Sequence, residues 1–131
     1  MSIENSGKFT LTTLCYVESG DKYLMLHRVK KKNDMNHDKY IGIGGHVEAD
    51  ESPLECIMRE AREETGLVLK NPELRGIITF LIDDYREVSF LYTCNDFSGT
   101  LRECNEGDLE WIPREKVGEL PLWKGDLIFF D

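Results

Sequence analysis

The stretch between Gly45 and Leu67 constrains this chain most, because it places charged residues at fixed intervals along one predicted helix. It reads glycine, five residues, Glu51, seven residues, and then REAREETGL. Glu60, Glu63 and Glu64 are spaced by three and four residues, so their side chains project from one helical face. Three carboxylates held this close repel one another unless a cation neutralises them.

Oxygen ligands of this kind suit Mg²⁺ or Mn²⁺, and these ions in turn usually hold substrate phosphates. The alternative is a solvated acidic helix face, which is common in a chain with 25 acidic residues. An ordinary solvated face does not require a glycine, an arginine and a further glutamate at fixed spacing. The pattern therefore favours a site for a divalent cation.

The predicted helix has clear start and stop signals. Ser52 is a suitable N-cap, Pro53 suits the first helical position, and Glu55 completes a capping box. Gly66 is expected to end the helix. Four apolar residues recur at helical spacing and are expected to face the core: Leu54, Ile57, Met58 and Ala61.

The remaining chain reads mainly as strands. The expected strands are 9–17, 22–29, 40–43, 74–82, 86–95 and 108–112, with an irregular loop at 30–39 and a short helix from Pro113 to Val117. Residues 122–130 fit either a helix or a strand. Strands on both sides of one central helix predict an α+β fold with a mixed β-sheet.

Composition indicates a single domain over residues 1–131. The 16 basic and 25 acidic residues give a net charge of −9, which argues against broad binding to nucleic acid or to an anionic membrane. No apolar run approaches the length of a membrane span. Cys15, Cys56 and Cys94 read as buried apolar residues, Cys104 has no clear assignment, and a reducing cytoplasm is the expected location.

Residues 45–67 resemble the Nudix box, G-x5-E-x7-R-E-U-x-E-E-x-G-U, in which U is apolar. The resemblance implies the Nudix α/β/α sandwich, which accommodates the order of elements given above. It also implies a hydrolase that acts on a nucleoside diphosphate linked to another moiety. The implied cofactor is Mg²⁺, with Mn²⁺ as the alternative.

The resemblance also implies individual roles. Glu60, Glu63 and Glu64 match metal ligands, and Glu60 also matches a proposed general base. Gly44 matches a residue whose backbone carbonyl binds metal, and Gly45 is a candidate substrate-binding position. Arg59 matches an arginine that pairs with the first box glutamate, here Glu51, and orients the catalytic loop; a plain surface salt bridge is the alternative.

A further acidic ligand is implied at Glu106, where Asp108 and Glu110 are nearby competitors. Similarity to MutT-type 8-oxo-dGTP diphosphatases extends beyond the box. It includes residues 24–28, 40–48, 105–107 and 111–113. Such enzymes convert an oxidised purine nucleoside triphosphate to the monophosphate and pyrophosphate.

The base side of the substrate site is less clearly indicated. Trp123 and Asp126 match positions that stack on and hydrogen-bond a purine, but a structural Trp beside a helix-capping Asp fits equally well. Ile41 stands where a relative carries a base-reading asparagine. Arg28 is a candidate phosphate contact, while the lysines at 30–32 fit either a solvated loop or phosphate steering.

Three functions therefore remain open. The first is a Mg²⁺-dependent diphosphatase of purine nucleoside triphosphates such as 8-oxo-dGTP or dGTP. The second is a Nudix hydrolase of ADP-ribose, a dinucleoside polyphosphate or a modified pyrimidine triphosphate. The third is a non-catalytic nucleotide-sensing module, which the complete set of box carboxylates disfavours. The expected partner is a small-molecule nucleotide, and the expected assembly is a monomer or homodimer.

Overall fold

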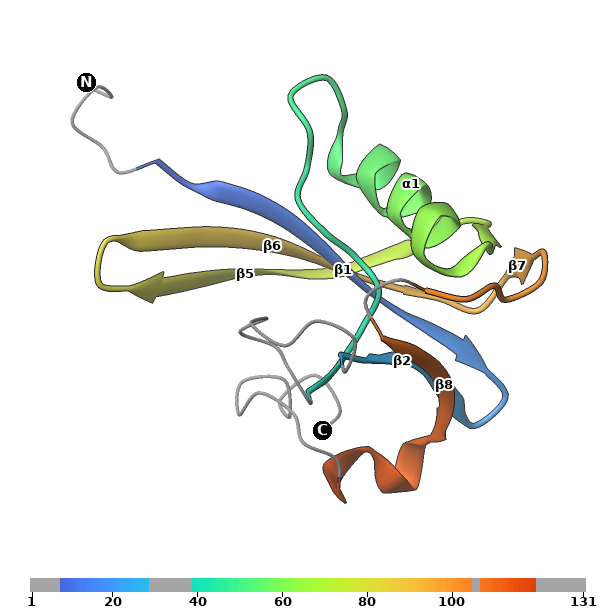
Figure 1. Cartoon of the computed structure of the whole chain (residues 1–131). Coiled ribbons are helices and arrows are strands. Elements are labelled where there is room, and N and C mark those ends of the chain that lie inside the picture. The colour runs from blue at the N-terminus through green and yellow to red at the C-terminus, as the bar shows by residue number, and fades with distance from the viewer. Residues whose placement is uncertain (1–7, 29–38, 105–106, 120–131) are drawn as a thin grey trace.

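The structure is a computed structural model that describes residues 8–28, 39–104 and 107–119. It shows a mixed β-sheet crossed on one face by a single α-helix (Figure 1). The elements in chain order are β1 (Thr10–Ser19), β2 (Lys22–His27), β3 (Tyr40–Ile41), α1 (Pro53–Thr65), β4 (Val68–Leu69), β5 (Glu73–Ile82), β6 (Tyr85–Cys94), β7 (Phe97–Ser98), β8 (Asp108–Pro113) and the 3₁₀-helix η1 (Arg114–Glu119).

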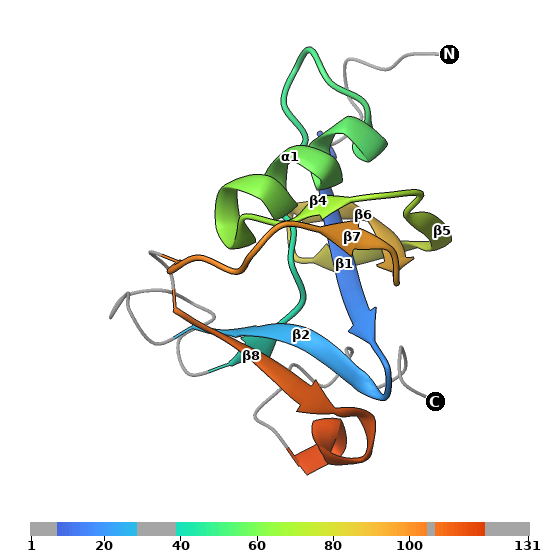
Figure 2. The same cartoon turned by 90° about the vertical axis from the view of Figure 1, so that its right-hand side faces the viewer.

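The main sheet has six strands: five follow the order β3-β2-β1-β6-β5, and β8 pairs with β2 along its whole length, from Lys22 to His27. β1 and β6 are parallel and pair from Thr10–Glu87 to Val17–Cys94, whereas the other pairs are antiparallel. The predicted α+β class with a mixed sheet is therefore confirmed. The short strands β4 and β7 form a separate two-stranded sheet beside α1 (Figure 2).

β1 and β2 pair only near their turn, at Val17–Ser19 and Lys22–Leu24. Beyond that point the strands diverge, and the segment that follows β3 runs antiparallel beside β1. Ile43 and Cys15 exchange backbone hydrogen bonds of 2.9 and 2.6 Å, and the Val47 N–H donates to Leu11 O at 2.9 Å. This pairing places Gly44 and Gly45 directly beside β1 and below α1.

Both ends of α1 are fixed by hydrogen bonds. The predicted capping box is confirmed, because Glu55 N–H donates to Ser52 Oγ at 3.1 Å while Ser52 N–H donates to Glu55 Oε1 at 2.9 Å. Gly66 ends the helix with φ of 83°, as predicted. Arg102 Nη2 donates to the carbonyls of Arg62 and Glu63 at 2.6 Å each. The final turn is therefore held in one orientation.

The core between α1 and the sheet contains Ile57 and Ala61 of the helix, both fully buried, as predicted. The prediction for Leu54 was wrong, since this side chain is 46% exposed. Cys56 is the residue of the first helical turn that faces the sheet, fully buried with its Sγ 3.2 Å from Thr13 Oγ1 on β1. All four cysteines lie among the described residues and are buried there, which adds Cys104 to the three that were predicted.

The opposite face of the sheet has its own apolar cluster, formed by Tyr16, Met25, Leu91, Ile112 and Val117. η1 supplies Val117, so the helix predicted after Pro113 is present, in 3₁₀ form. The predicted strand at 40–43 is shorter than expected, ending at Ile41. The segment 122–130 lies outside the described residues. Within the described part of the chain, no helix is both long and apolar enough to cross a membrane.

Candidate active site

Arg59 joins α1 to the loop that precedes it. Its Nε donates to Glu51 Oε2 at 3.0 Å and its Nη2 donates to Glu51 Oε1 at 2.7 Å. This two-point contact fixes the orientation of both side chains and pairs their opposite charges. The Glu51 side chain is 10% exposed and the Arg59 side chain 24% exposed, so the pair is only partly screened by water. The expected pairing of Arg59 with Glu51 is present.

The same guanidinium also reaches along the helix. Arg59 Nη1 donates to Glu60 Oε1 at 2.8 Å and to Glu63 Oε2 at 3.1 Å. Arg59 Nη2 additionally donates to the His46 carbonyl at 3.3 Å. One cation therefore connects the loop carboxylate, the loop backbone and two helix carboxylates. We call Arg59 with Glu51, Glu60, Glu63 and the His46 carbonyl the Arg59 network.

Hydrogen bonding lowers the pKa of Glu51 to about 2. The largest cause is its hydrogen bond with Arg59, followed by the bond from the Glu48 backbone N–H, whose length is 3.0 Å. The Glu48 carboxylate lies 3.7 Å from Arg59 Nη2, but its side chain is 61% exposed. Glu51, rather than Glu48, is therefore the main acidic partner of Arg59.

Gly45 lies directly against the carboxylate of Glu60. A Cβ at position 45 would lie 2.7 Å from Glu60 Cδ and less than 3 Å from both carboxylate oxygens. Only glycine leaves room for the carboxylate in this position. The glycine expected from the spacing of the box is therefore required by the position of Glu60.

Thr13 holds Gly45 in place from the opposite side. Its backbone N–H donates to the Gly45 carbonyl at 2.9 Å, and its hydroxyl donates to the same oxygen at 3.3 Å. Cys56 Sγ lies 3.5 Å from the His46 carbonyl. Burial raises the pKa of Cys56 to about 11, so the thiol remains protonated and able to donate.

Gly44 lies between Ile43 and Gly45, whose backbone groups bond to β1. A Cβ at this position would lie 2.0 Å from the Thr13 carbonyl oxygen. The close approach to β1 explains why glycine is present here, and the ligand role of its carbonyl stays a prediction.

The donor chemistry fits a hard divalent cation, because the oxygen atoms of Glu60, Glu63, Glu64 and the Gly44 carbonyl are ligands that such ions prefer. Within the described ranges, however, no three His, Cys, Asp or Glu side chains are arranged to hold a metal ion. Glu60 and Glu63 each direct an oxygen to the same guanidinium nitrogen instead. The helix therefore carries the candidate ligands, but their side chains are not gathered around a common point.

The candidate substrate residues are only partly described. Arg28 directly follows β2, and its backbone N–H donates to the Lys39 carbonyl at 2.9 Å. Glu106, Trp123 and Asp126 lie outside the described residues. Of the two competitors of Glu106, Glu110 lies with its carboxylate 3.9 Å from His27 Nδ1, whereas Asp108 is exposed at the start of β8.

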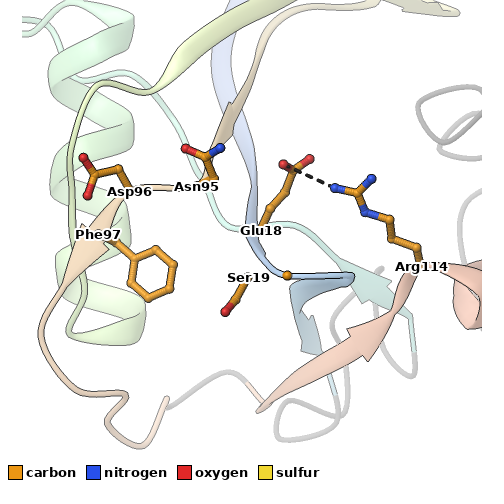
Figure 3. Close-up of a pocket in the computed structure, with 7 residues that line it drawn as sticks. Glu18, Ser19, Asn95, Asp96, Phe97 and Arg114 are labelled. Atoms are coloured by element: carbon orange, nitrogen blue, oxygen red, sulfur yellow. Dashed lines mark ion pairs between the residues drawn. The ribbon is translucent and has the colours of Figure 1, made fainter.

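A separate hollow lies where the parallel strands β1 and β6 end (Figure 3). It has a volume of about 490 Å³ and is lined by Glu18, Ser19, Gly20, Asn95, Asp96, Phe97 and Arg114. Arg114 pairs with Glu18 across it at 3.4 Å. None of the lining residues belongs to the 45–67 segment, so the hollow supplies no group to the Arg59 network.

Thr13, Cys56 and Arg102 contact the backbone around this site, and no sequence motif indicates a functional role for any of them. Thr13 lies 32 residues from Gly45, and Arg102 lies 39 residues from Glu63. Their contacts depend on which strand lies beside the glycines and which loop crosses the end of α1. Only the three-dimensional fold supplies that information.

Comparison with known proteins gives a consistent result. The family model described as "NUDIX domain" matches residues 8–131. The uncharacterized Nudix hydrolase YvcI of Bacillus subtilis is 31% identical, over 87% of this chain and 72% of the relative. The crystal structure of a MutT protein from Bacillus halodurans is 33% identical, with a TM-score of 0.80 and coverage of 93% of this chain and 80% of that one.

Two further relatives carry more specific names. The oxidized purine nucleoside triphosphate hydrolase of Danio rerio is 25% identical over 92% of this chain and 76% of the relative. The CTP pyrophosphohydrolase of Escherichia coli is 28% identical over 85% of this chain and 81% of the relative.

The low pKa of Glu51 predicts a specific pH dependence of stability. Its folded pKa of about 2 lies below the ordinary 4.5, so its ionised form stabilises the fold above pH 4.5, and this contribution is lost as the pH falls toward 2. Denaturant unfolding of wild type and Glu51→Gln should give a stability difference that is constant above pH 5 and shrinks below 4.5. The exposed control Glu115→Gln should show no such change, and a Glu51→Gln difference independent of pH would contradict the assignment.

The contact between Gly45 and Glu60 predicts the effect of a single methyl group. Gly45→Ala should displace the Glu60 carboxylate and lower the hydrolysis of a nucleotide-derived substrate about 100-fold. Gly76→Ala is the matched control, because no atom lies within 4 Å of its added Cβ. Steady-state kinetics and circular dichroism on both variants test this, and equal activities would show that the carboxylate position is unimportant.

Proposed function

This chain belongs to the NUDIX domain family, and on that premise we propose that it hydrolyses purine nucleoside triphosphates to the monophosphate and pyrophosphate. Family membership makes it a Nudix hydrolase that acts on phosphoric anhydrides of a nucleotide-derived substrate. The proposal adds the purine base, including oxidised forms such as 8-oxo-dGTP, and Mg²⁺ as the preferred ion. The proposed setting is removal of damaged nucleotides in the cytoplasm.

The observation that carries the chemical part of the proposal is the position of Glu60. Its carboxylate lies against Gly45 on one side and accepts a hydrogen bond from Arg59 on the other. A carboxylate fixed at the junction of a glycine loop and a helix is well placed to act on a water molecule near a bound phosphate. We assign Glu60 the role of general base for the water that attacks the β-phosphorus.

The neighbouring residues complete the proposed site. Glu60, Glu63, Glu64 and the Gly44 carbonyl would hold the divalent ion, with Glu106 as a further ligand. When bound, Mg²⁺ neutralises charge that develops on the phosphate oxygens. Arg59 retains Glu51 through two hydrogen bonds, while its single contacts with Glu60 and Glu63 are the ones that ion binding would exchange. Arg28 would contact the phosphates.

Support for a purine comes from the relatives and not from the described site. The Danio rerio relative is named for oxidised purine nucleotides, and its similarity spans 92% of this chain. We propose that Trp123 stacks on the base and that Asp126 hydrogen-bonds its edge. Ile41 packs against the core between α1 and the sheet, so it contributes no hydrogen-bonding group to base recognition.

A pyrimidine triphosphate is the second candidate substrate. The observation that favours it is the similarity to CTP pyrophosphohydrolase, at 28% identity over 85% of this chain. In this proposal the Arg59 network acts only on the phosphates and the metal ion, so it is compatible with a purine or a pyrimidine nucleotide. ADP-ribose and dinucleoside polyphosphates are compatible with the same network.

The role of Glu60 predicts a large and specific loss of turnover. Glu60→Gln keeps the size of the side chain but removes its charge and its basicity, so kcat should fall by roughly 10²–10⁴-fold. Stopped assays of pyrophosphate release with Mg²⁺ measure this, and Glu115→Gln on η1 is the control that should retain wild-type activity. An unchanged kcat in Glu60→Gln would rule out its assignment as the base.

The base preference predicts the ranking of a substrate panel. The kcat/KM for 8-oxo-dGTP should exceed that for CTP and ADP-ribose by at least about tenfold, because a site that stacks on and hydrogen-bonds a purine edge leaves those groups unpaired with other substrates. Product analysis by chromatography should show monophosphate and pyrophosphate. A higher kcat/KM for CTP would replace the purine assignment, and turnover of none of the substrates would favour a binding module.

A further inference from the structure

β5 forms one margin of the main sheet. The strand is ten residues long, stands last in the strand order, and among the described residues pairs only with β6. Figure 2 shows it at the outer side of the sheet, away from β2 and β8. Its outer side therefore presents backbone N–H and C=O groups that can receive another strand.

Charges and a β-bulge occur only at the beginning of β5, at Glu73, Arg75 and the register shift between Leu74 and Gly76; the rest of the strand lacks such protection. Residues 76–82 read GIITFLI and contain neither a charge nor a proline. Ile77 is 58% exposed, Leu81 is 66% exposed and Ile82 is 63% exposed. Natural proteins shorten or charge such edges, because an uncharged apolar edge strand invites association with other chains.

Exposed apolar side chains occur on β5 and also on residues 9 and 11, on the same face of the sheet. Ile77 pairs directly with Phe90, which packs against the core under α1, so Ile77 and Leu81 point to the same face as α1. Leu81 pairs with Arg86, whose guanidinium lies 5.7 Å from the centre of the Phe9 ring. Phe9 is 45% exposed and Leu11 is 41% exposed. We call Phe9, Leu11, Ile77 and Leu81 the β5 patch.

We propose that β5 pairs with β5 of a second copy of this chain, antiparallel about a twofold axis, so that the two sheets become continuous. A twofold axis makes one strand its own partner and closes the assembly at two subunits. With the axis at Thr79, Ile77 lies opposite Leu81 of the partner subunit and Ile78 lies opposite Phe80 of the partner subunit. Apolar side chains then meet on both faces of the joined sheet.

The charges at the ends of β5 favour the antiparallel direction. Arg75 lies near the beginning of the strand and is 56% exposed, whereas Asp83 and Asp84 form the turn that follows its end. Arg75 already contacts Glu73 at 3.1 Å within the chain. Antiparallel pairing places the Arg75 end of one copy beside the acidic turn of the other, and a parallel arrangement would place like ends together.

The proposed interface leaves the Arg59 network open. Figure 1 shows the turn between β5 and β6 projecting away from α1, whose carboxylates carry the proposed chemistry. Hydrolytic activity should therefore persist when the two copies separate. Hydrolytic activity can therefore show that a variant is correctly folded, whether or not it forms the dimer.

Sedimentation equilibrium of the full chain tests the proposal. Wild type should give twice the chain mass of 15.2 kDa, with a dimer dissociation constant that Leu81→Lys raises at least about 100-fold, because each new charge must be buried at the interface. Leu54→Lys is the matched control, since Leu54 is 46% exposed on α1 and lies outside the β5 patch. Both variants should retain wild-type circular dichroism and nucleotide hydrolysis.

A cysteine substitution locates the twofold axis. The four native cysteines are buried, so Thr79→Cys provides a selective exposed thiol that should form a disulfide-linked dimer on mild oxidation. Asp83→Cys is the control and should not cross-link, because it lies at the end of the paired segment. Monomeric wild type, open-ended growth beyond the dimer, or a dimer that is equally stable in Leu81→Lys would each overturn the proposal. Cross-linking through Asp83→Cys but not Thr79→Cys would do the same.

Discussion

The guanidinium of Arg59 holds together the charged residues of α1 and of the loop that precedes it. It binds Glu51 at two points and reaches Glu60 and Glu63 with its remaining nitrogen, so that the loop before α1 and the helix itself are joined by one side chain. Without this cation, the three carboxylates at this junction would repel one another. The strongly acidic composition makes that requirement more acute. The loop therefore owes its position to electrostatics as much as to apolar packing.

The backbone pairing of the glycine segment with β1 also positions the Glu60 carboxylate. The divergence of β1 from β2 leaves space for the glycine segment to pair with β1, and Thr13 then holds the Gly45 carbonyl. This pairing sets Gly45 against Glu60, where even a methyl group would displace the carboxylate. Residues far apart in the sequence thus determine where the proposed catalytic carboxylate can lie.

Local features were predictable from the sequence, and long-range ones were not. Ser52, Glu55 and Gly66 determine the ends of α1 through contacts within a few residues, so the helix was predicted correctly. The parallel pairing of β1 with β6 depends on segments more than 70 residues apart, and β4 and β7 have only two residues each. Leu54 was misplaced because helical spacing alone does not show which stripe meets β1. The pairing of Arg59 with Glu51 was anticipated from the Nudix box, whereas the supporting roles of Thr13 and Arg102 required the fold.

The central claim is that the carboxylates held near Arg59 are ligands for a divalent ion. Titration with Mn²⁺, followed by electron paramagnetic resonance, measures this directly in the presence of a nucleotide. The account predicts saturable uptake by the wild-type protein and at least about tenfold weaker uptake when Glu63 and Glu64 are both changed to glutamine. Equal uptake by the two proteins, or none by the wild type, would contradict it.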